Sequence, residues 1–341
     1  KFCLECLEKS RLSCHDPIVF MLISIGITIF GRSEYISNTI TSILNNNKYN
    51  IEVIVGNDDA STFLTKADLN ISDSRLRIVN NTSNLGERLN MKSLLMAARG
   101  EYFTWLADDD YYESGLIDEL YKVACTKKHR VIYTSYTFSD RTDRSLIIDE
   151  YISYNFINLA LSRKIKAISI YALYDREFLI NINPLERLHN GKIALFTEYY
   201  LFLASLSDKR VLFISSPAVR VNVNHDSWSV SNNEVDLYYK AGISLSKKLY
   251  NLLESNGKNL PNSVKVSIYM AIFNLILNFY TSVSRRSVSF ISSIRNSLSY
   301  FLLISRLYKN MEVFPGYIWI ILSFNHFFRS VKIFKVFFVK K

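Results

Sequence analysis

Cysteine is scarce in this chain, with 4 Cys among 341 residues. Three of them, Cys3, Cys6 and Cys14, lie near the beginning, and only Cys125 lies in the body of the sequence. A body with a single thiol excludes the small secreted domains that depend on a disulfide framework, and it favours a cytosolic protein. The Cys3-x-x-Cys6 spacing suits one half of a zinc site, but no second ligand pair follows at zinc-finger spacing. We therefore predict that residues 1–20 form a tail without a role in function.

Acidic residues are almost absent from the last quarter of the chain. From Ser255 to Lys341 there are 12 Lys and Arg and one acid, Glu312, which gives this stretch a net charge of +11. The preceding part keeps the other 29 basic and 30 acidic residues, a net of −1, so the last quarter accounts for the whole formal charge of +10. This asymmetry predicts a positively charged surface that meets an anionic partner.

Long apolar runs are missing from the same quarter. Its longest uncharged run, Val313 to Phe328, is interrupted by Pro, Asn and His and is shorter than the ~20 residues that span a membrane. The many Phe, Ile and Val favour an anionic membrane surface over a nucleic acid, which needs interleaved polar contacts. The alternative is a helical cap on the core with a solvated basic face. We predict a helical, amphipathic, membrane-associating region over residues 236–341 and no nucleic acid as a partner.

The composition is that of a folded protein, with 49% hydrophobic and 14% aromatic residues. Stretches rich in Val, Ile and aromatic residues alternate with stretches that have apolar residues at helical spacing. This alternation predicts an α/β fold with a mostly parallel sheet flanked by helices. The predicted strands are Leu22–Phe30, Ile51–Asn57, Arg75–Asn80, Tyr102–Ala107 and Val131–Thr137, and the predicted helices are Ser33–Leu44, Glu87–Ala98 and Gly115–Ala124.

Further along the chain the pattern is less regular. We expect a polar loop from Asp140 to Asp149, a return to the sheet within Ile165–Tyr174 and an apolar helix within Asn190–Leu206. Two short strands, Val211–Ile214 and Ala218–Val223, are expected to follow.

Aspartates follow two of the predicted strands at the point where each strand ends. Asp58 and Asp59 follow the second strand, and the three consecutive aspartates 108–110 follow the fourth. Because the carboxyl ends of parallel strands meet at one edge of a sheet, both clusters are expected where open α/β folds bind ligands. Three like charges in a row are stable when they are solvated or when a divalent cation bridges them to a phosphate. A solvated turn with helix-capping aspartates is the alternative to a nucleotide and metal site.

Two of these runs resemble motifs of glycosyltransferase family 2. Gly100–Asp110 (GEYFTWLADDD) resembles the run into the metal-binding motif of that family, and Glu52–Ser61 (EVIVGNDDAS) resembles its uridine-binding strand end. Further matching stretches, in the same order, are Ile25–Arg32, Asn84–Gly86 and Asn90. The family is inverting and has the nucleotide-diphospho-sugar transferase fold called GT-A.

The resemblance covers roughly residues 21–230 and implies a GT-A, Rossmann-like domain over residues 21–235. That domain lies between the tail 1–20 and the C-terminal region 236–341. The opening turn departs from the family pattern, because Phe30-Gly31-Arg32 replaces an aromatic residue, Asn and Arg.

The resemblance also implies a site for a nucleotide-sugar donor, with a UDP-sugar expected. Thr28 and Arg32 would line the base pocket, Asp58 would accept the imide N–H of uracil, and Asp108 would contact the ribose or the sugar. Asp59 is interpreted as the cap of the following turn. Thr28 is also explained by the preference of Thr for strands.

A divalent cation is implied at the end of the same run. Asp109, Asp110 and His225 are the candidate ligands of Mn²⁺ or Mg²⁺, which prefer hard oxygen donors and neutralise the charge of a leaving diphosphate. The triplet alone does not show which carboxylate contacts the ion directly. For His225, a surface histidine is the alternative reading.

Glu198 resembles the general base of the family, which is usually an Asp at the start of a helix. Its apolar neighbours Phe196, Tyr199 and Leu201 are expected to desolvate the carboxylate and raise its pKa. The alternative is an acid at a helix start that the helix dipole stabilises.

Taken with the basic C-terminal region, the resemblance implies a metal-dependent inverting glycosyltransferase. It would move a sugar from a UDP-sugar to a glycan or lipid-linked acceptor in bacterial surface polysaccharide biosynthesis. We expect it in the cytoplasm, peripheral on the inner face of the plasma membrane. The alternative is a catalytically inactive, membrane-associated protein that binds a glycan or a partner on a degenerate transferase fold.

Overall fold

A computed structural model describes residues 21–31, 35–45, 49–138, 146–187 and 197–222, together with a few residues between 255 and 268. Two of the predicted site residues, Arg32 and His225, lie outside the described residues. Almost all of the predicted helical, basic region over 236–341 lies outside them as well.

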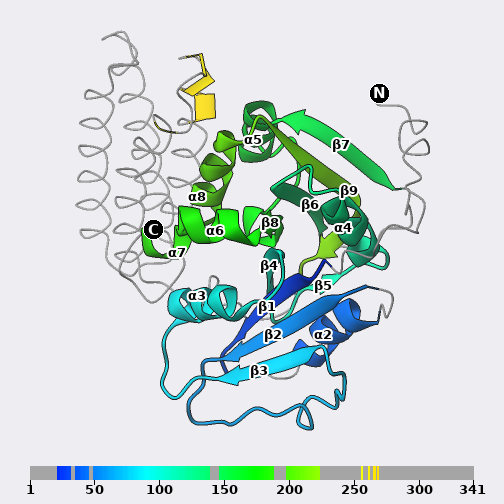
Figure 1. The fold of residues 1–341 in the computed structure, drawn as a ribbon, viewed down its shortest axis with the longest axis vertical. Coiled ribbons are helices and arrows are strands. Elements are labelled where there is room, and N and C mark those ends of the chain that lie inside the picture. Colours follow the sequence, from blue (N-terminus) through cyan, green and yellow to red (C-terminus); the bar gives the residue numbers. More distant parts are fainter. Residues whose placement is uncertain are drawn as a thin grey trace, which may run out of the picture.

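The strands of the described chain form one mixed sheet of nine strands (Figure 1). They are β1 (Ile23–Ile29), β2 (Ile51–Asn57), β3 (Leu76–Asn80), β4 (Tyr102–Ala107), β5 (Tyr111–Tyr112), β6 (Val131–Thr137), β7 (Ile147–Ile152), β8 (Leu173–Asp175) and β9 (Arg210–Arg220). Their order is β3-β2-β1-β4-β8-β6-β9-β5, and β7 pairs with β9. Strands β1 to β4 are parallel to one another and β6 is parallel to β9, whereas β5, β7 and β8 are antiparallel to their neighbours. The predicted α/β fold with a mostly parallel sheet is confirmed.

Helices cover both faces of the sheet. They are α2 (Ile36–Leu44), α3 (Glu87–Ala97), α4 (Leu116–Cys125), α5 (Ser153–Leu161), α6 (Arg176–Ile182), α7 (Pro184–Arg187) and α8 (Thr197–Ala204), with the 3₁₀ turns η1 (Ser169–Tyr171) and η2 (Ser205–Ser207). The apolar residues of α2 and α4 join one core cluster, and those of α3, α5, α6, α7 and α8 join the other. Figure 1 shows α2 and α3 on opposite sides of β1 and β2.

The central strand β1 explains how the two layers form. Its four isoleucines alternate along the strand and are all buried against α2, each contributing about 1.5–3 kcal/mol of burial free energy. The opposite face of β1 carries only small side chains. A Cβ atom at Gly26 would lie 2.8 Å from Cζ of Phe103 and 3.2 Å from Cβ of Leu94 in α3, so a larger side chain does not fit there. The missing side chain of Gly26 therefore allows α3 to pack closely on the sheet.

Two of the predictions for the later part of the chain are wrong. The two short strands predicted at Val211–Ile214 and Ala218–Val223 are one strand, β9, which continues through the cis Ser216–Pro217 peptide bond. The end of the loop predicted at Asp140–Asp149 belongs to β7, whose residues are mostly exposed. A strand without a buried face lacks the alternation of apolar and polar residues by which strands are recognised.

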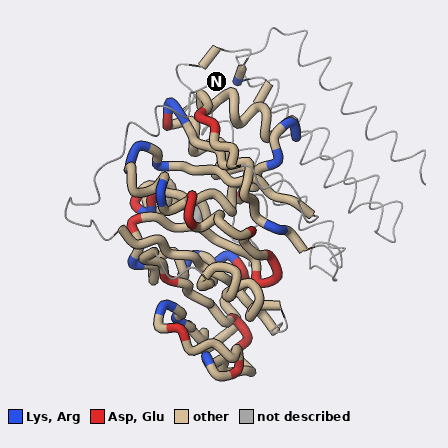
Figure 2. Tube along the Cα trace, turned by 90° about the vertical axis from the view of Figure 1, so that its right-hand side faces the viewer, with Lys and Arg blue, Asp and Glu red and all other residues tan. Residues whose placement is uncertain are grey.

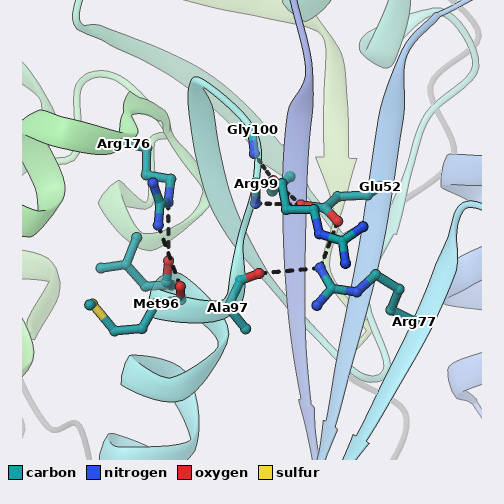
Figure 3. A network of polar contacts seen from close by, with 9 residues as sticks. Glu52, Arg77, Met96, Ala97, Arg99, Gly100 and Arg176 are labelled. Atoms are coloured by element: carbon teal, nitrogen blue, oxygen red, sulfur yellow. Dashed lines mark hydrogen bonds and ion pairs between the residues drawn. The ribbon is translucent and has the colours of Figure 1, made fainter.

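A buried carboxylate organises the amino ends of β1, β2 and β4 (Figure 3). Glu52 is only 6% exposed and accepts hydrogen bonds from Ser24 Oγ at 2.6 Å, from the Arg99 amide at 2.7 Å and from Arg77 Nη1 at 2.8 Å. The hydroxyl of Ser24 also accepts a hydrogen bond from the Gly100 amide at 2.8 Å. Burial alone would raise the pKa of Glu52, but these donors and the Arg77 charge lower it overall. This network lies at the edge opposite to the aspartate clusters.

Charge is evenly mixed on the described chain, where Figure 2 shows acidic and basic residues interspersed. Within the same residues, no helix has both the length and the apolar character that crossing a bilayer requires.

Candidate active site

The strand register brings the predicted site residues to one edge of the sheet. Thr28, near the end of β1, lies beside Gly56 of β2 on one side and Ala107 of β4 on the other. The residues that follow β2 and β4 therefore flank the end of β1, as parallel strands require. Thr28 is the one residue of β1 that is not buried. The structure thus places it at the edge where the pocket described below begins.

Asp58 is a structural anchor at this edge. Its carboxylate is 3% exposed and accepts hydrogen bonds from the amides of Leu85 at 2.8 Å and Gly86 at 2.7 Å, and from Asn81 Nδ2 at 3.0 Å. These bonds fix the loop that leads into α3, where Gly86 has a φ of 81°. Both oxygens of Asp58 therefore already accept hydrogen bonds from the protein. The neighbouring Asp59 is the other candidate for the uracil contact that was predicted for Asp58.

That neighbour, Asp59, lines a pocket of about 300 Å³ at the ends of β1 and β2, together with Gly31 and Phe63. The Asp59 carboxylate accepts hydrogen bonds from Ser61 Oγ at 2.5 Å and from the Ser61 amide at 3.0 Å, and these hold the pKa of Asp59 below its usual range. The ring of Phe63 is 78% exposed, and Phe30, between two pocket-lining residues, is 58% exposed. Exposed rings beside a carboxylate suit a planar ligand with N–H donors.

The aspartate triplet follows β4 at the same edge. Asp108 and Asp110 are 8% and 2% exposed, whereas Asp109 is partly exposed. The backbone carbonyl of Asp108 accepts a hydrogen bond from Thr39 Oγ1 of α2 at 2.9 Å, which holds the start of the turn.

Asp110 is the point at which distant segments meet. Its Oδ1 accepts a hydrogen bond from the Asn222 amide at 2.9 Å, directly after β9, and its Oδ2 accepts one from the hydroxyl of Tyr171 in η1. Two neutral donors thus fix this carboxylate without removing its charge. A fixed carboxylate beside a second, more exposed one suits Mg²⁺ or Mn²⁺, which bind through carboxylate oxygens. No group of three His, Cys, Asp or Glu residues gathers within the described part of the chain, and His225 lies beyond it.

Tyr171 connects the aspartates to the predicted base. The pKa of its hydroxyl is raised well above the usual value, first by burial and then by the charges of Asp110, Asp109 and Glu198. All three carboxylates therefore lie within electrostatic reach of one buried phenol, which remains a hydrogen-bond donor.

Glu198 is the second residue of α8 and is partly exposed. Burial raises the pKa of its carboxyl, and a hydrogen bond with Tyr199 and the charge of Arg163 offset part of that rise. Its backbone carbonyl accepts a hydrogen bond from Ser169 Oγ at 2.5 Å. A carboxylate with a raised pKa at the rim of the site has the chemistry of a general base.

The structure thus bonds Asp110 to Tyr171 and places Asp109 and Glu198 within electrostatic reach of the same phenol. It places Thr28 at the same edge, and it engages Asp58 with the following loop. Two features were not predicted, the role of Tyr171 and the pocket beside Asp59. Tyr171 lies in a segment read only as a return to the sheet, and nothing local distinguishes it from the other tyrosines of that segment.

Comparison with known proteins identifies the domain. The family model described as "Glycosyl transferase family 2" matches residues 24–182. This part of the chain belongs to glycosyltransferase family 2. The matched residues of this family 2 domain include both aspartate clusters and Tyr171, whereas Glu198 lies beyond them.

Three curated relatives are glycosyltransferases by name. A putative glycosyltransferase of Bacillus subtilis, EpsH, is 22% identical over 277 residues, which are 77% of this chain and 79% of that one. An uncharacterized glycosyltransferase of Rickettsia typhi is 29% identical over 127 residues, 37% of this chain and 39% of the relative. Streptococcus pneumoniae GlyG is 27% identical over 125 residues, 36% and 41% of the two chains. The chain thus spans about two fifths of the Rickettsia and Streptococcus relatives.

Solved structures share the fold of this chain. S. aureus TarS 1–349 in complex with UDP-GlcNAc has a TM-score of 0.62 at 14% identity, covering 86% of this chain and 82% of that one. The same protein in complex with UDP has a TM-score of 0.62 at 15% identity, covering 84% and 82%. The expected GT-A-like α/β fold is confirmed by these matches.

Proposed function

We propose that this chain is a metal-dependent inverting glycosyltransferase that uses a UDP-sugar. The observation that carries the proposal is that Tyr171 bonds to Asp110 and lies within electrostatic reach of Asp109 and Glu198, in a domain whose β1 and β2 ends form the pocket beside Asp59. Family membership supports a transferase, and the TarS structures with UDP and UDP-GlcNAc support a nucleotide-sugar donor.

The pocket beside Asp59 would hold the base of the donor. Asp59 would accept the uracil N–H in place of Asp58, whose oxygens already bind the loop before α3. An exposed ring, Phe30 or Phe63, would stack on the base, and stacking of this kind contributes about 1–3 kcal/mol. Thr28 and Arg32 would contribute to the base site, as predicted from the sequence.

Asp109 and Asp110, with His225, would hold Mn²⁺ or Mg²⁺, and Asp108 would contact the ribose or the sugar. The bound ion supplies Lewis-acid neutralisation of the charge on the departing diphosphate. The protein contributes the fixed orientation of Asp110, which Tyr171 and Asn222 hold from both oxygens.

Glu198 would act as the general base. The acceptor hydroxyl oxygen forms a bond to the anomeric carbon while the bond from that carbon to the diphosphate oxygen breaks, and the hydroxyl proton passes to Glu198. One displacement of this kind inverts the configuration at the anomeric carbon. Burial supports the role because it raises the pKa of Glu198 toward the working pH of a base.

The acceptor that we propose is a glycan or a lipid-linked saccharide of bacterial surface polysaccharide synthesis. The net charge of +11 from Ser255 to Lys341 would hold the enzyme on an anionic membrane at the inner face of the plasma membrane.

Calorimetric titration of UDP into the full chain, with and without Mn²⁺ and beside Asp109→Ala, tests the proposal. We expect binding that needs Mn²⁺, prefers UDP over GDP and is lost in the variant. A folded protein that binds neither nucleotide in the presence of Mn²⁺ would contradict the donor site and favour the non-catalytic alternative.

A further inference from the structure

The turn η1 contacts the candidate metal site and the candidate base at the same time. At one end of its three residues, Tyr171 donates its hydroxyl hydrogen bond to Oδ2 of Asp110. At the other end, Ser169 Oγ donates to the backbone carbonyl of Glu198 at 2.5 Å. A three-residue turn therefore bonds to both halves of the site.

This turn is itself fixed from two strands. Thr134 Oγ1 of β6 donates to the carbonyl of Tyr171 at 3.2 Å, and the Tyr174 hydroxyl of β8 donates to the carbonyl of Ser169 at 2.7 Å. Ser169 and Tyr174 are both fully buried. Hydrogen bonds from two strands thus fix the backbone of the turn at Ser169 and at Tyr171.

We propose that η1 is a coupling element in which Tyr171 positions Asp110 and Ser169 positions the start of α8. Binding of the donor and the metal at Asp110 then orders Glu198 before the acceptor reacts. The proposal rests on the proposed function, since it assigns the order in which the two halves of that site become competent. Partners of a metal-binding carboxylate commonly contribute about 10–100-fold to metal affinity.

The first measurement is the Mn²⁺ concentration at half-maximal UDP binding, by calorimetry on the full chain. We expect Tyr171→Phe to raise it about 10–100-fold. Tyr102→Phe is the matched control, because Tyr102 is also buried and its hydroxyl donates to the carbonyl of His129 at 2.8 Å, not to Asp110 or to η1. That control should keep the wild-type value.

The second measurement is hydrogen–deuterium exchange of peptides that cover 197–204. We expect Mn²⁺ and UDP together to slow exchange there in the wild type and in Tyr102→Phe. At saturating Mn²⁺ and UDP the slowing should be absent in Tyr171→Phe. Ser169→Ala should keep the wild-type Mn²⁺ requirement for UDP binding and lose the slowing in α8, since it breaks only the link to Glu198.

The outcomes separate the coupling from the function on which it rests. If the wild type binds UDP with Mn²⁺ and Tyr171→Phe behaves as Tyr102→Phe does in both measurements, the coupling is overturned and the proposed function stands. Unchanged exchange in α8 of the wild type on binding also overturns the coupling. If the wild type shows no Mn²⁺-dependent UDP binding, the metal-dependent function fails and the coupling fails with it.

Discussion

At the scale of single residues, Glu198 shows how burial changes the acidity of a carboxyl group. The same apolar packing that stabilises the start of α8 raises the pKa of this carboxyl, so it holds a proton more strongly than an exposed glutamate. A base of this kind accepts a proton from a sugar hydroxyl more readily than an ordinary carboxylate does.

Glu198→Gln should therefore lower the transfer rate about 10²–10⁴-fold and leave UDP binding unchanged. Glu177→Gln is the matched control, because Glu177 is the acid in the first turn of another helix, α6. Steady-state turnover and calorimetry on both variants measure the effect. Equal, small losses in the two variants would show that Glu198 only complements a helix dipole.

The dependence of wild-type turnover on pH in the acid range also tests whether Glu198 is the base. In the proposed role Glu198 accepts a proton only when it is deprotonated, so turnover should fall as the pH drops through its raised pKa, above the value of about 4.3 for an ordinary glutamate. A profile that stays flat down to that value would contradict the assignment.

Asp58 and Asp59 are neighbours with different environments. Asp58→Ala would remove the buried carboxylate that accepts hydrogen bonds from the amides of Leu85 and Gly86, and should lower the free energy of unfolding by about 1–3 kcal/mol. Asp59→Ala, at a partly exposed position, should leave the free energy of unfolding nearly unchanged and weaken UDP binding. Urea unfolding and calorimetry distinguish the two. Lost UDP affinity in Asp58→Ala at unchanged stability would restore the original assignment of the uracil contact.

The aspartates could be predicted from sequence, because an apolar strand and the residue that ends it are adjacent in the chain. Tyr171 could not, because its contact with Asp110 joins positions 61 residues apart and no local pattern records it. Which of Asp58 and Asp59 is available to contact uracil depends on where the loop before α3 lies. That loop bonds to Asp58 from positions 27 and 28 residues later, so the local sequence does not record it either.

At the scale of elements, the network around Glu52 ties the amino ends of the central strands together (Figure 3). It holds β2 to its neighbours in the sheet at the edge away from the candidate active site. One buried carboxylate thus fixes the amino ends of the strands whose carboxyl ends carry the aspartates.

Glu52→Gln should lower the free energy of unfolding by about 1–3 kcal/mol at neutral pH, because an amide cannot accept all three hydrogen bonds. The folded-state pKa of Glu52 is lowered, so its stabilisation is present above the unfolded value of about 4.3 and is lost as the pH falls through the folded value. The deficit of the variant should therefore shrink in acid. Urea titrations at neutral and acid pH measure this.

Glu101→Gln is the control for that experiment. Glu101 pairs with Lys127 at 2.5 Å but is 44% exposed, and exposed pairs contribute about 0–1 kcal/mol. Equal effects of the two variants at neutral pH would contradict the role of burial in the Glu52 network.

Strands β1, β2 and β4 follow their predicted bounds closely because nearly all of their residues are buried, and β3 follows its bounds although only Leu76 is buried. Strand β7 was not predicted, because its polar and exposed residues resemble a loop. Strand β9 was divided at Pro217, a residue that usually interrupts strands, although its two parts pair with β6 on either side of an irregularity.

At the scale of the whole molecule, charge is distributed unevenly along the sequence. The part before Ser255 is close to neutral, and Figure 2 shows its charges interspersed over the described residues. The +11 that follows is concentrated in the last quarter of the chain.

The full chain should sediment with vesicles that contain phosphatidylserine and not with vesicles of phosphatidylcholine alone. Added salt should reduce the sedimentation, because each Lys or Arg near an anionic surface contributes about 1 kcal/mol that ions screen. Retention on a DNA column run in parallel is the control. Salt-sensitive retention on DNA without sedimentation would contradict the membrane assignment and favour a nucleic-acid surface.

The hydrogen bonds of Asp110 also have a consequence for the order of biosynthesis. The aspartate leaves the ribosome early, whereas its donors Tyr171 and Asn222 follow 61 and 112 positions later. Contacts this distant in sequence form only after the intervening chain has closed into place. A nascent chain that already displays the aspartate triplet therefore cannot yet orient it. We expect the enzyme to become competent for donor binding only once β9 has been translated and has joined the sheet.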